Sequence, residues 1–283
     1  MAVSGGNWQI FSTMLERCNT SCAVVRETTV ASISQANRDD SRYTLSTKTA
    51  TESDASPYQY PIEFDSVIVA TPWQYAGISA ADGLLAAPIE EIKYRHLHVT
   101  LFTTAHRLSR EYFGLGADAK IPTSVLTTRT PNGEDKAGFI SVSTVGGFKN
   151  PMTGVDEWVY KIFSMQPVTP EFVSSILSVI LPDAPLEGKL DGPISWYYPH
   201  VFNSYPILET KSTFQDPVLA DRLYYTSGIE SFISTMETSA LMGKNVAQLA
   251  WDDMRTAKPR AHSHLGQQED QHVLADSTVG RDH

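Results

Sequence analysis

A glycine turn followed by acidic residues is the first candidate for chemistry in this chain. Ser227 and Gly228 interrupt the short apolar run at 223–225, and Glu230 follows at once. Thr235 then precedes an apolar pattern with helical spacing. Free backbone N–H groups and the positive dipole end make a helix start suitable for an anion or an electron-rich ring. An ordinary strand-to-helix crossover is the alternative explanation.

A second candidate lies at the end of an apolar run at 64–70. The run is nearly continuous, which is typical of a strand buried on both faces of a sheet, and Thr71 and Pro72 end it. Ligands of open α/β sheets bind at the carboxyl ends of the strands. We therefore expect this turn to lie beside a ligand crevice, although a plain buried strand end explains it as well.

Aromatic and histidine residues form two further groups. Trp196, Tyr198 and His200 belong to the run WYYPH, which either lines a ligand cavity or is a rigid edge segment packed on the core. His96 and His98 alternate on a predicted strand and share one face. Two histidines alone lack a third ligand at suitable spacing, so we expect no metal site. No Ser/His/Asp set, carboxylate pair or P-loop occurs, and the catalytic residues stay unassigned.

The elements that position these groups fall into three parts. Residues 7–17 are predicted to form a helix, and strands are expected at 23–25, 29–33, 43–45 and 64–70, with a loop at 47–60. Further strands are expected at 96–104, 124–130, 139–145 and 157–164, and a helix at 170–181 with Thr169 as its N-cap. Strand runs without βαβ alternation indicate a mixed or antiparallel sheet. The polar tail at 258–283 is expected to be disordered.

Composition and charge restrict the functional class of this protein. The chain has 283 residues, of which 41% are hydrophobic, enough for a sizeable core. Its net charge of −10 argues against nucleic acid or an anionic membrane as a partner. We expect no transmembrane helix, because no apolar run approaches the ~18 residues that one requires. The start of the chain also lacks the pattern of a signal peptide.

Six stretches share their order and spelling with a known family: DRLYYTSGIE from Asp221, TMETSA from Thr235, VYKIFS from Val159, WYYPH from Trp196, SVIVATP from Ser66 and APIEE from Ala87. Together they resemble the prenylcysteine oxidase (prenylcysteine lyase) family of amine-oxidase-like FAD enzymes. The glycine turn and helix start are typical of the whole superfamily, whereas VYKIFS and WYYPH are typical of the narrower family. No G-x-G-x-x-G turn occurs, so the sequence is expected to be the C-terminal portion of a longer flavoenzyme.

The resemblance implies an α/β (α+β) fold with two domains. Residues 1–80 and 215–257 would form a partial, Rossmann-like FAD-binding domain, and residues 81–214 a substrate domain with a mixed or antiparallel sheet. The implied FAD contacts are Val30 at the adenine, Ala70, Thr71 and Pro72 beside the crevice, Gly228, Ile229 and Glu230 within it, and Thr235, Met236 and Glu237 at a helix start aimed at the flavin. Trp196, Tyr198 and His200 would contact the substrate.

The implied activity is FAD-dependent oxidation of the thioether of farnesyl- or geranylgeranyl-cysteine. Cysteine, a prenyl aldehyde and hydrogen peroxide would be formed, with O2 as the electron acceptor. Two alternatives remain: a truncated, non-catalytic remnant with a lipid-binding substrate domain, or another substrate of the amine-oxidase superfamily. The family resemblance also implies a lysosomal, vacuolar or other endomembrane location.

A short polar segment at 18–22 contains candidate residues for glycosylation and for thiol chemistry. Asn19 begins a glycosylation sequon, Asn-Thr-Ser, which would accept a glycan only in the secretory pathway. Cys18 and Cys22 flank it, and their spacing on a helix would strain a disulfide, so free thiols are expected.

Overall fold

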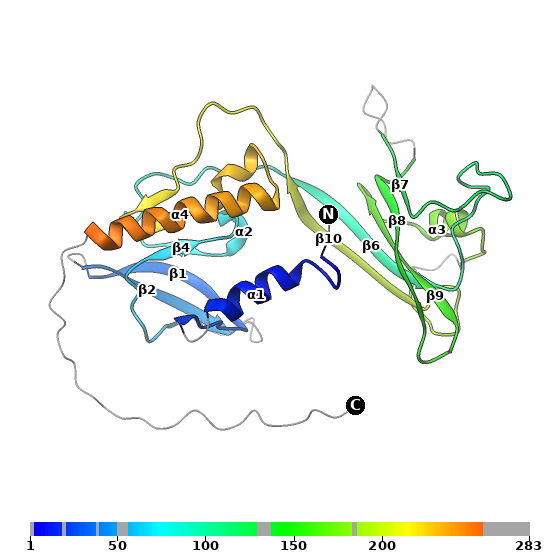
Figure 1. Ribbon diagram of the computed structural model, residues 1–283, viewed down its shortest axis with the longest axis horizontal. Helices are drawn as coiled ribbons and strands as arrows, with labels where there is room; N and C mark the ends of the chain where they lie inside the picture. Colours follow the sequence, from blue (N-terminus) through cyan, green and yellow to red (C-terminus); the bar gives the residue numbers. More distant parts are fainter. Residues whose placement is uncertain are drawn as a thin grey trace.

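The structure is a computed structural model that describes residues 3–18, 21–37, 40–49, 56–128, 137–182 and 186–256. The described residues form a four-stranded, a three-stranded and a five-stranded sheet. Figure 1 shows two lobes: a small-sheet lobe that holds the first two sheets, and a large-sheet lobe that holds the third. Strands β6 and β10 lead from one lobe into the other (Figure 1). The mixed α+β class expected from the sequence is confirmed.

The four-stranded sheet has the order β3-β2-β1-β5. Its strands are β1 (Thr28–Asn37), β2 (Asp40–Thr49), β3 (Tyr58–Gln59) and β5 (Ser79–Ala80). The strands predicted at 29–33 and 43–45 are therefore confirmed, and β2 continues into the predicted loop as far as Thr49. The strand predicted at 23–25 is wrong: this segment pairs with no strand, and its valines stay exposed.

The three-stranded sheet contains the two parallel strands that matter for the site. Its order is β11 (Val218–Ala220), β12 (Leu223–Tyr225) and β4 (Val67–Val69), with β12 parallel to β4. Val69, Leu223 and Tyr225 share one hydrophobic core with Ile33 and Tyr43 of the neighbouring sheet. The pattern of the 64–70 segment is typical of a strand buried on both faces, whereas the side chain of Ile68 is 44% exposed. Uncovered aliphatic side chains are expected on this strand if the FAD-binding domain is partial.

The five-stranded sheet forms the large-sheet lobe in the order β10-β6-β9-β8-β7. Its strands are β6 (Tyr94–Thr104), β7 (Ser124–Leu126), β8 (Ser141–Lys149), β9 (Asp156–Ser164) and β10 (Trp196–Pro206). Every pairing within it is antiparallel. The four strands predicted between 96 and 164 are confirmed, although β7 ends earlier and β8 begins and ends later than expected. All its strands come from the predicted substrate domain, but the domain limits themselves stay a prediction.

Helix α3 (Pro170–Leu177) covers one face of this sheet. Thr169 caps the helix by accepting a hydrogen bond from the Phe172 amide, as expected from the sequence. The helix ends before the predicted Leu181 because Ser178 adopts a left-handed conformation, with φ of 52°. Phe102 and Tyr160 point toward α3 and join its core. We call this the covered face, and the opposite one the open face.

The remaining helices belong to the small-sheet lobe. They are α1 (Trp8–Cys18), α2 (Trp73–Ala76), the 3-10 helix η2 (Ser227–Ser231) and α4 (Met236–Thr256). Cys18 and Cys22 form a disulfide with a Cα–Cα distance of 5.5 Å, so the expectation of free thiols is wrong. The prediction assumed that both cysteines lie on one helix, whereas α1 ends at Cys18 and Cys22 lies beyond it. Asn19 and the tail at 258–283 lie outside the described residues.

Candidate functional site

The two parallel strands end at the same edge of their sheet. Tyr225 of β12 lies opposite Val69 of β4, and the Thr226 amide donates to the Val69 carbonyl at 3.1 Å. The segments that follow therefore leave the sheet together. Thr71, after β4, and Gly228, after β12, lie at this edge, which we call the carboxyl edge. Their predicted proximity is confirmed, whereas their contact with a cofactor stays a prediction.

Gly228 is needed for close packing with a neighbouring segment. A Cβ at this position would lie 2.7 Å from Gln215 Cβ, far inside normal contact distance. The absence of a side chain thus lets η2 pack against residue 215. Any larger residue would displace η2 from the carboxyl edge. The glycine in the sequence pattern therefore has a structural reason independent of any cofactor.

The start of α4 is capped by two threonines. The Thr238 amide donates to Thr235 Oγ1 at 3.2 Å, and the Thr235 amide donates to Thr238 Oγ1 at 3.1 Å. A hydrogen bond from its own backbone amide, followed by one from the Thr235 hydroxyl, lowers the pKa of Glu237. The expected strand, turn, acidic residue and helix are all present. The helix start and Glu237 are exposed to solvent.

Glu230 is held from the large-sheet lobe. The Tyr94 hydroxyl at the start of β6 donates a hydrogen bond to Glu230 Oε2. Burial, followed by this hydrogen bond and the Glu230 charge, raises the pKa of Tyr94 far above its usual value. The Tyr94 ring also packs edge-on against Tyr75 of α2, with 5.2 Å between centroids. A tyrosine that the sequence analysis did not single out therefore links the two lobes at the carboxyl edge.

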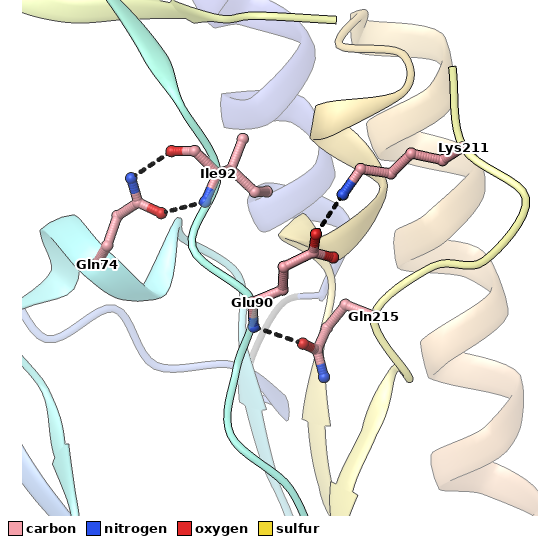
Figure 2. A network of polar contacts seen from close by, with 5 residues as sticks. All are labelled: Gln74, Glu90, Ile92, Lys211 and Gln215. Atoms are coloured by element: carbon pink, nitrogen blue, oxygen red, sulfur yellow. Dashed lines mark hydrogen bonds and ion pairs between the residues drawn. The ribbon is translucent and has the colours of Figure 1, made fainter. Parts of the chain in front are cut away.

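The two segments that connect the lobes are joined by a polar network, shown in Figure 2. The Gln74 side chain bonds the Ile92 amide at 2.8 Å and the Ile92 carbonyl at 2.6 Å. The Glu90 amide donates to Gln215 Oε1 at 2.8 Å, and Lys211 Nζ lies 2.6 Å from Glu90 Oε1. These contacts tie the segment entering β6 to the segment leaving β10. They fix both beside α2 and η2.

Val30 lies on β1 and packs against the core cluster that also contains Val69 and Tyr225. It borders a cavity of about 420 Å³ whose lining is mainly apolar. Thr47 contributes a buried hydroxyl to this lining, and that hydroxyl has no hydrogen-bond partner. No residue of the carboxyl edge lines the cavity. The predicted contact between Val30 and the adenine thus stays a prediction.

The three predicted substrate residues lie together on β10. Trp196, Tyr198 and His200 stack successively, with centroids 6.0 and 5.8 Å apart, and Phe202 continues the series at 5.5 Å. We call these four residues the aromatic row. Because Tyr197 packs into the α3 core, the alternation of side chains places the row on the open face. Trp196, Tyr198 and Phe202 are 46%, 45% and 43% exposed.

A cavity of about 310 Å³ lies beside the row. Its lining is Arg95, Leu97, Thr127, Thr128, Phe139, Ile140, Phe163 and Tyr205. Leu97 lies directly opposite Phe202 in the β6–β10 pairing, so the cavity and the aromatic row meet. Arg95 is the only cation in the lining. Arg95 could not be predicted from the sequence as a binding residue, because a lone arginine in a strand belongs to no motif.

The described residues contain no cluster of three His, Cys, Asp or Glu side chains that could hold a metal ion, so they offer no candidate metal site. His96 and His98 share a face as predicted, with ring centroids 6.1 Å apart, and His96 contacts Asn203. A relaxed glycine motif, G-x-G-x-x-A, occurs from Gly114 to Ala119. It lies in an irregular loop with no helix after it, so it lacks the strand–turn–helix context of a dinucleotide site.

The carboxyl edge has donors that fit one side of a flavin. The start of α4 carries the positive end of a helix dipole, although the amides of Thr235, Glu237 and Thr238 are already bonded within the cap. The Ser231 hydroxyl at the end of η2 is buried without a partner. Helix starts and ligand-facing strand ends are general features of nucleotide sites in α/β proteins. The residues present are therefore compatible with part of an FAD site.

Fold and site together define an α+β protein with a cofactor-compatible carboxyl edge beside an open, aromatic sheet face. Residues 1–262 match the family described as prenylcysteine lyase, over most of the chain. The chain belongs to the prenylcysteine lyase family. Within the described ranges, no helix is long and apolar enough to cross a membrane.

Curated relatives carry names that agree with this family. Farnesylcysteine lyase of Arabidopsis thaliana is 27% identical over 251 residues, which cover 88% of this chain and 41% of that protein. Prenylcysteine oxidase 1 of Rattus norvegicus is 28% identical over 270 residues, covering 88% and 46%. The mouse protein of the same name is also 28% identical, over 268 residues. The chain thus spans less than half the length of these relatives.

Proposed function

We propose that this chain provides the substrate lobe and one edge of the FAD site of a prenylcysteine-oxidising enzyme. The observation that carries the proposal is the position of the aromatic row and its cavity. They occupy an open sheet face on which β6 begins and β10 ends near Glu230 and the carboxyl edge. Family membership and the names of the relatives support the same reaction class.

The proposed reaction converts a prenylcysteine, water and O2 into cysteine, a prenyl aldehyde and hydrogen peroxide. FAD, when bound, would supply the capacity to accept a hydride from the carbon next to sulfur. The residues of this chain would bind the cofactor and the substrate and orient them toward each other. Thr71, Gly228, Ile229, Glu230 and the start of α4 at Thr235–Glu237 would hold the cofactor, together with Ala70 and Pro72, and Val30 would flank its adenine. The aromatic row would hold the prenyl chain.

The open face can supply the required affinity. Burying a fifteen-carbon isoprenoid at ~0.8 kcal/mol per methylene gains on the order of 10 kcal/mol before the costs of binding. Aromatic rings suit such a chain because they offer large apolar surfaces. The disulfide between Cys18 and Cys22 supports an oxidising compartment, in agreement with the proposed lysosomal, vacuolar or other endomembrane lumen.

A non-catalytic, lipid-binding remnant is the second candidate. The exposure of Ile68 on β4 favours it, because a complete flavin domain would be expected to cover this strand. In that case the large-sheet lobe would still bind prenylated ligands, while cofactor binding and turnover would be absent.

One experiment separates the two candidates. Purified protein is titrated with farnesylcysteine by calorimetry, and then incubated with O2, farnesylcysteine and enough FAD to saturate a weak site, while peroxide and farnesal are measured. Binding with turnover supports the enzyme, and binding without turnover even at saturating FAD supports the remnant. No binding of farnesylcysteine would contradict both. Unmodified cysteine is the matched control ligand, because it lacks the isoprenoid.

A further inference from the structure

We propose that Arg95 and the aromatic row bind prenylcysteine in one direction, so that Trp196 sets the length of chain that is accepted. The cysteine carboxylate would pair with Arg95, and the prenyl tail would extend along β10 toward Trp196. This inference rests on the proposed function, and it identifies the residues that recognise each end of the substrate.

The carboxylate end is assigned by the chemistry of the cavity. Arg95 Nη1 lies 4.0 Å from the Met165 sulfur, a weak contact, and no carboxylate of the described residues forms an ion pair with it. The rest of the lining is apolar apart from two threonine side chains and the Tyr205 hydroxyl. A guanidinium in such surroundings suits a carboxylate, which it can bind through two parallel hydrogen bonds.

The direction follows from strand register. Arg95 directly follows Tyr94, whose hydroxyl contacts Glu230, so Arg95 lies at the end of β6 that is nearer to the carboxyl edge. Opposite, β10 pairs Tyr205 with Arg95 and Phe202 with Leu97. Trp196 pairs with Thr103, at the other end of β6. A ligand anchored at Arg95 therefore extends away from the carboxyl edge, from Phe202 toward Trp196.

The length of the aromatic row limits the length of prenyl chain that it can contact. Phe202 and Trp196 are six positions apart, which corresponds to about 20 Å of extended strand. A fifteen-carbon and a twenty-carbon tail that begin at the same point share the contacts near Phe202 and differ only at the distal end. There the apolar row stops: Ser195 donates a hydrogen bond to the buried carboxylate of Glu157, which also accepts one from Asn150 at 2.7 Å. Trp196 is thus the last ring available to the longer chain.

Calorimetry without FAD tests both ends of the assignment. The ligands are farnesylcysteine, geranylgeranylcysteine and farnesylcysteine methyl ester, which lacks the carboxylate charge. Arg95→Gln should lower the affinity for farnesylcysteine about tenfold, as expected for loss of a charged hydrogen bond. The affinity for the methyl ester should change by no more than about twofold. Trp196→Ala should lower the affinity for geranylgeranylcysteine about tenfold and that for farnesylcysteine only about twofold. Trp196→Phe keeps an aromatic ring and should retain most of the affinity for geranylgeranylcysteine that Trp196→Ala loses.

The controls are chosen from exposed positions outside the site. Trp251→Ala removes an exposed tryptophan of α4, and Arg255→Gln removes a charge from the same helix. Both should bind all three ligands as the unchanged protein does. Equal losses for acid and ester in Arg95→Gln, or for both chain lengths in Trp196→Ala, would overturn this inference while leaving the proposed function intact. Absence of binding by the unchanged protein would overturn both.

Discussion

The Tyr94 hydroxyl at the start of β6 donates a hydrogen bond to Glu230 of η2, a residue 136 positions away in the sequence. Burial and the Glu230 carboxylate raise the pKa of this tyrosine, so Tyr94 remains a donor well above neutral pH. The first strand of the large sheet thereby holds the turn that follows β12. The geometry of the carboxyl edge consequently depends on the large-sheet lobe as well as on its own sheet.

Tyr94→Phe should weaken the contact between the lobes. The ring and its contact with Tyr75 are kept, while Glu230 loses one donor, so the free energy of unfolding should fall by about 1–2 kcal/mol. Urea denaturation measures this change. Tyr75→Phe is the control, and it should have little effect. Equal losses in the two variants would contradict a specific role of the Tyr94–Glu230 hydrogen bond.

Stability should decline in alkaline solution partly through Tyr43. Burial, followed by the Asp221 charge, raises the pKa of Tyr43 to about 12 from 10.0. Because the folded pKa is higher, the contribution is complete below pH 10 and is lost as pH rises from 10 through 12. Its full size is on the order of 2–3 kcal/mol. Tyr43→Phe should flatten this decline in urea titrations between these pH values, whereas the exposed Tyr58→Phe should not. Parallel curves for Tyr43→Phe and the unchanged protein would be the contrary result.

The buried pair of Asn150 and Glu157 should contribute strongly to the stability of the large-sheet lobe. The Asn150 amide donates to Glu157 Oε1 at 2.7 Å, and both residues are almost fully buried. Asn150→Ala leaves a buried carboxylate oxygen without this donor and should cost about 1–3 kcal/mol. Asn150→Asp places a second acid there and should cost more. Thermal unfolding measures these losses, and Asn203→Ala, at an exposed position, is the control. An unchanged melting temperature for Asn150→Asp would refute the role assigned to this pair.

FAD should bind weakly to this chain by itself. The sequence has no G-x-G-x-x-G turn, which in dinucleotide sites supplies backbone donors and a helix dipole for the pyrophosphate. Purified protein should be colourless, without flavin absorbance after dialysis. A yellow protein with one FAD per chain would show that another segment replaces this turn.

Limited proteolysis should distinguish the two lobes. The large-sheet lobe has its own core beneath α3, so a fragment of about 81–214 should resist cleavage. Residues 1–60 and those after Met254 should be cut early, because α1 has no buried residue and Ile68 on β4 is exposed. Mass spectrometry of the fragments identifies the sites. Uniform resistance across residues 1–254 would mean that both lobes form one equally stable unit.

Local sequence patterns predicted the elements of the large-sheet lobe well. Alternating side chains identified β6, and Thr169 with Pro170 located the start of α3, because these signals act over a few residues. The local pattern at 64–70 could not show which face of β4 is uncovered, since burial of a strand depends on neighbours from elsewhere in the chain. The roles of Tyr94 and Arg95 depend on strand register and on contacts across more than a hundred residues, for which no local signal exists.

The position of Pro199 has a consequence for association between molecules. β10 is the edge strand of its sheet, and its exposed rings would make it a template for pairing with a second chain. Proline has no N–H, and in edge strands its nitrogen is placed toward solvent. Pro199 thus interrupts the row of free donors in the middle of β10. An apolar strand can in this way remain accessible to a small ligand while being protected from edge-to-edge aggregation.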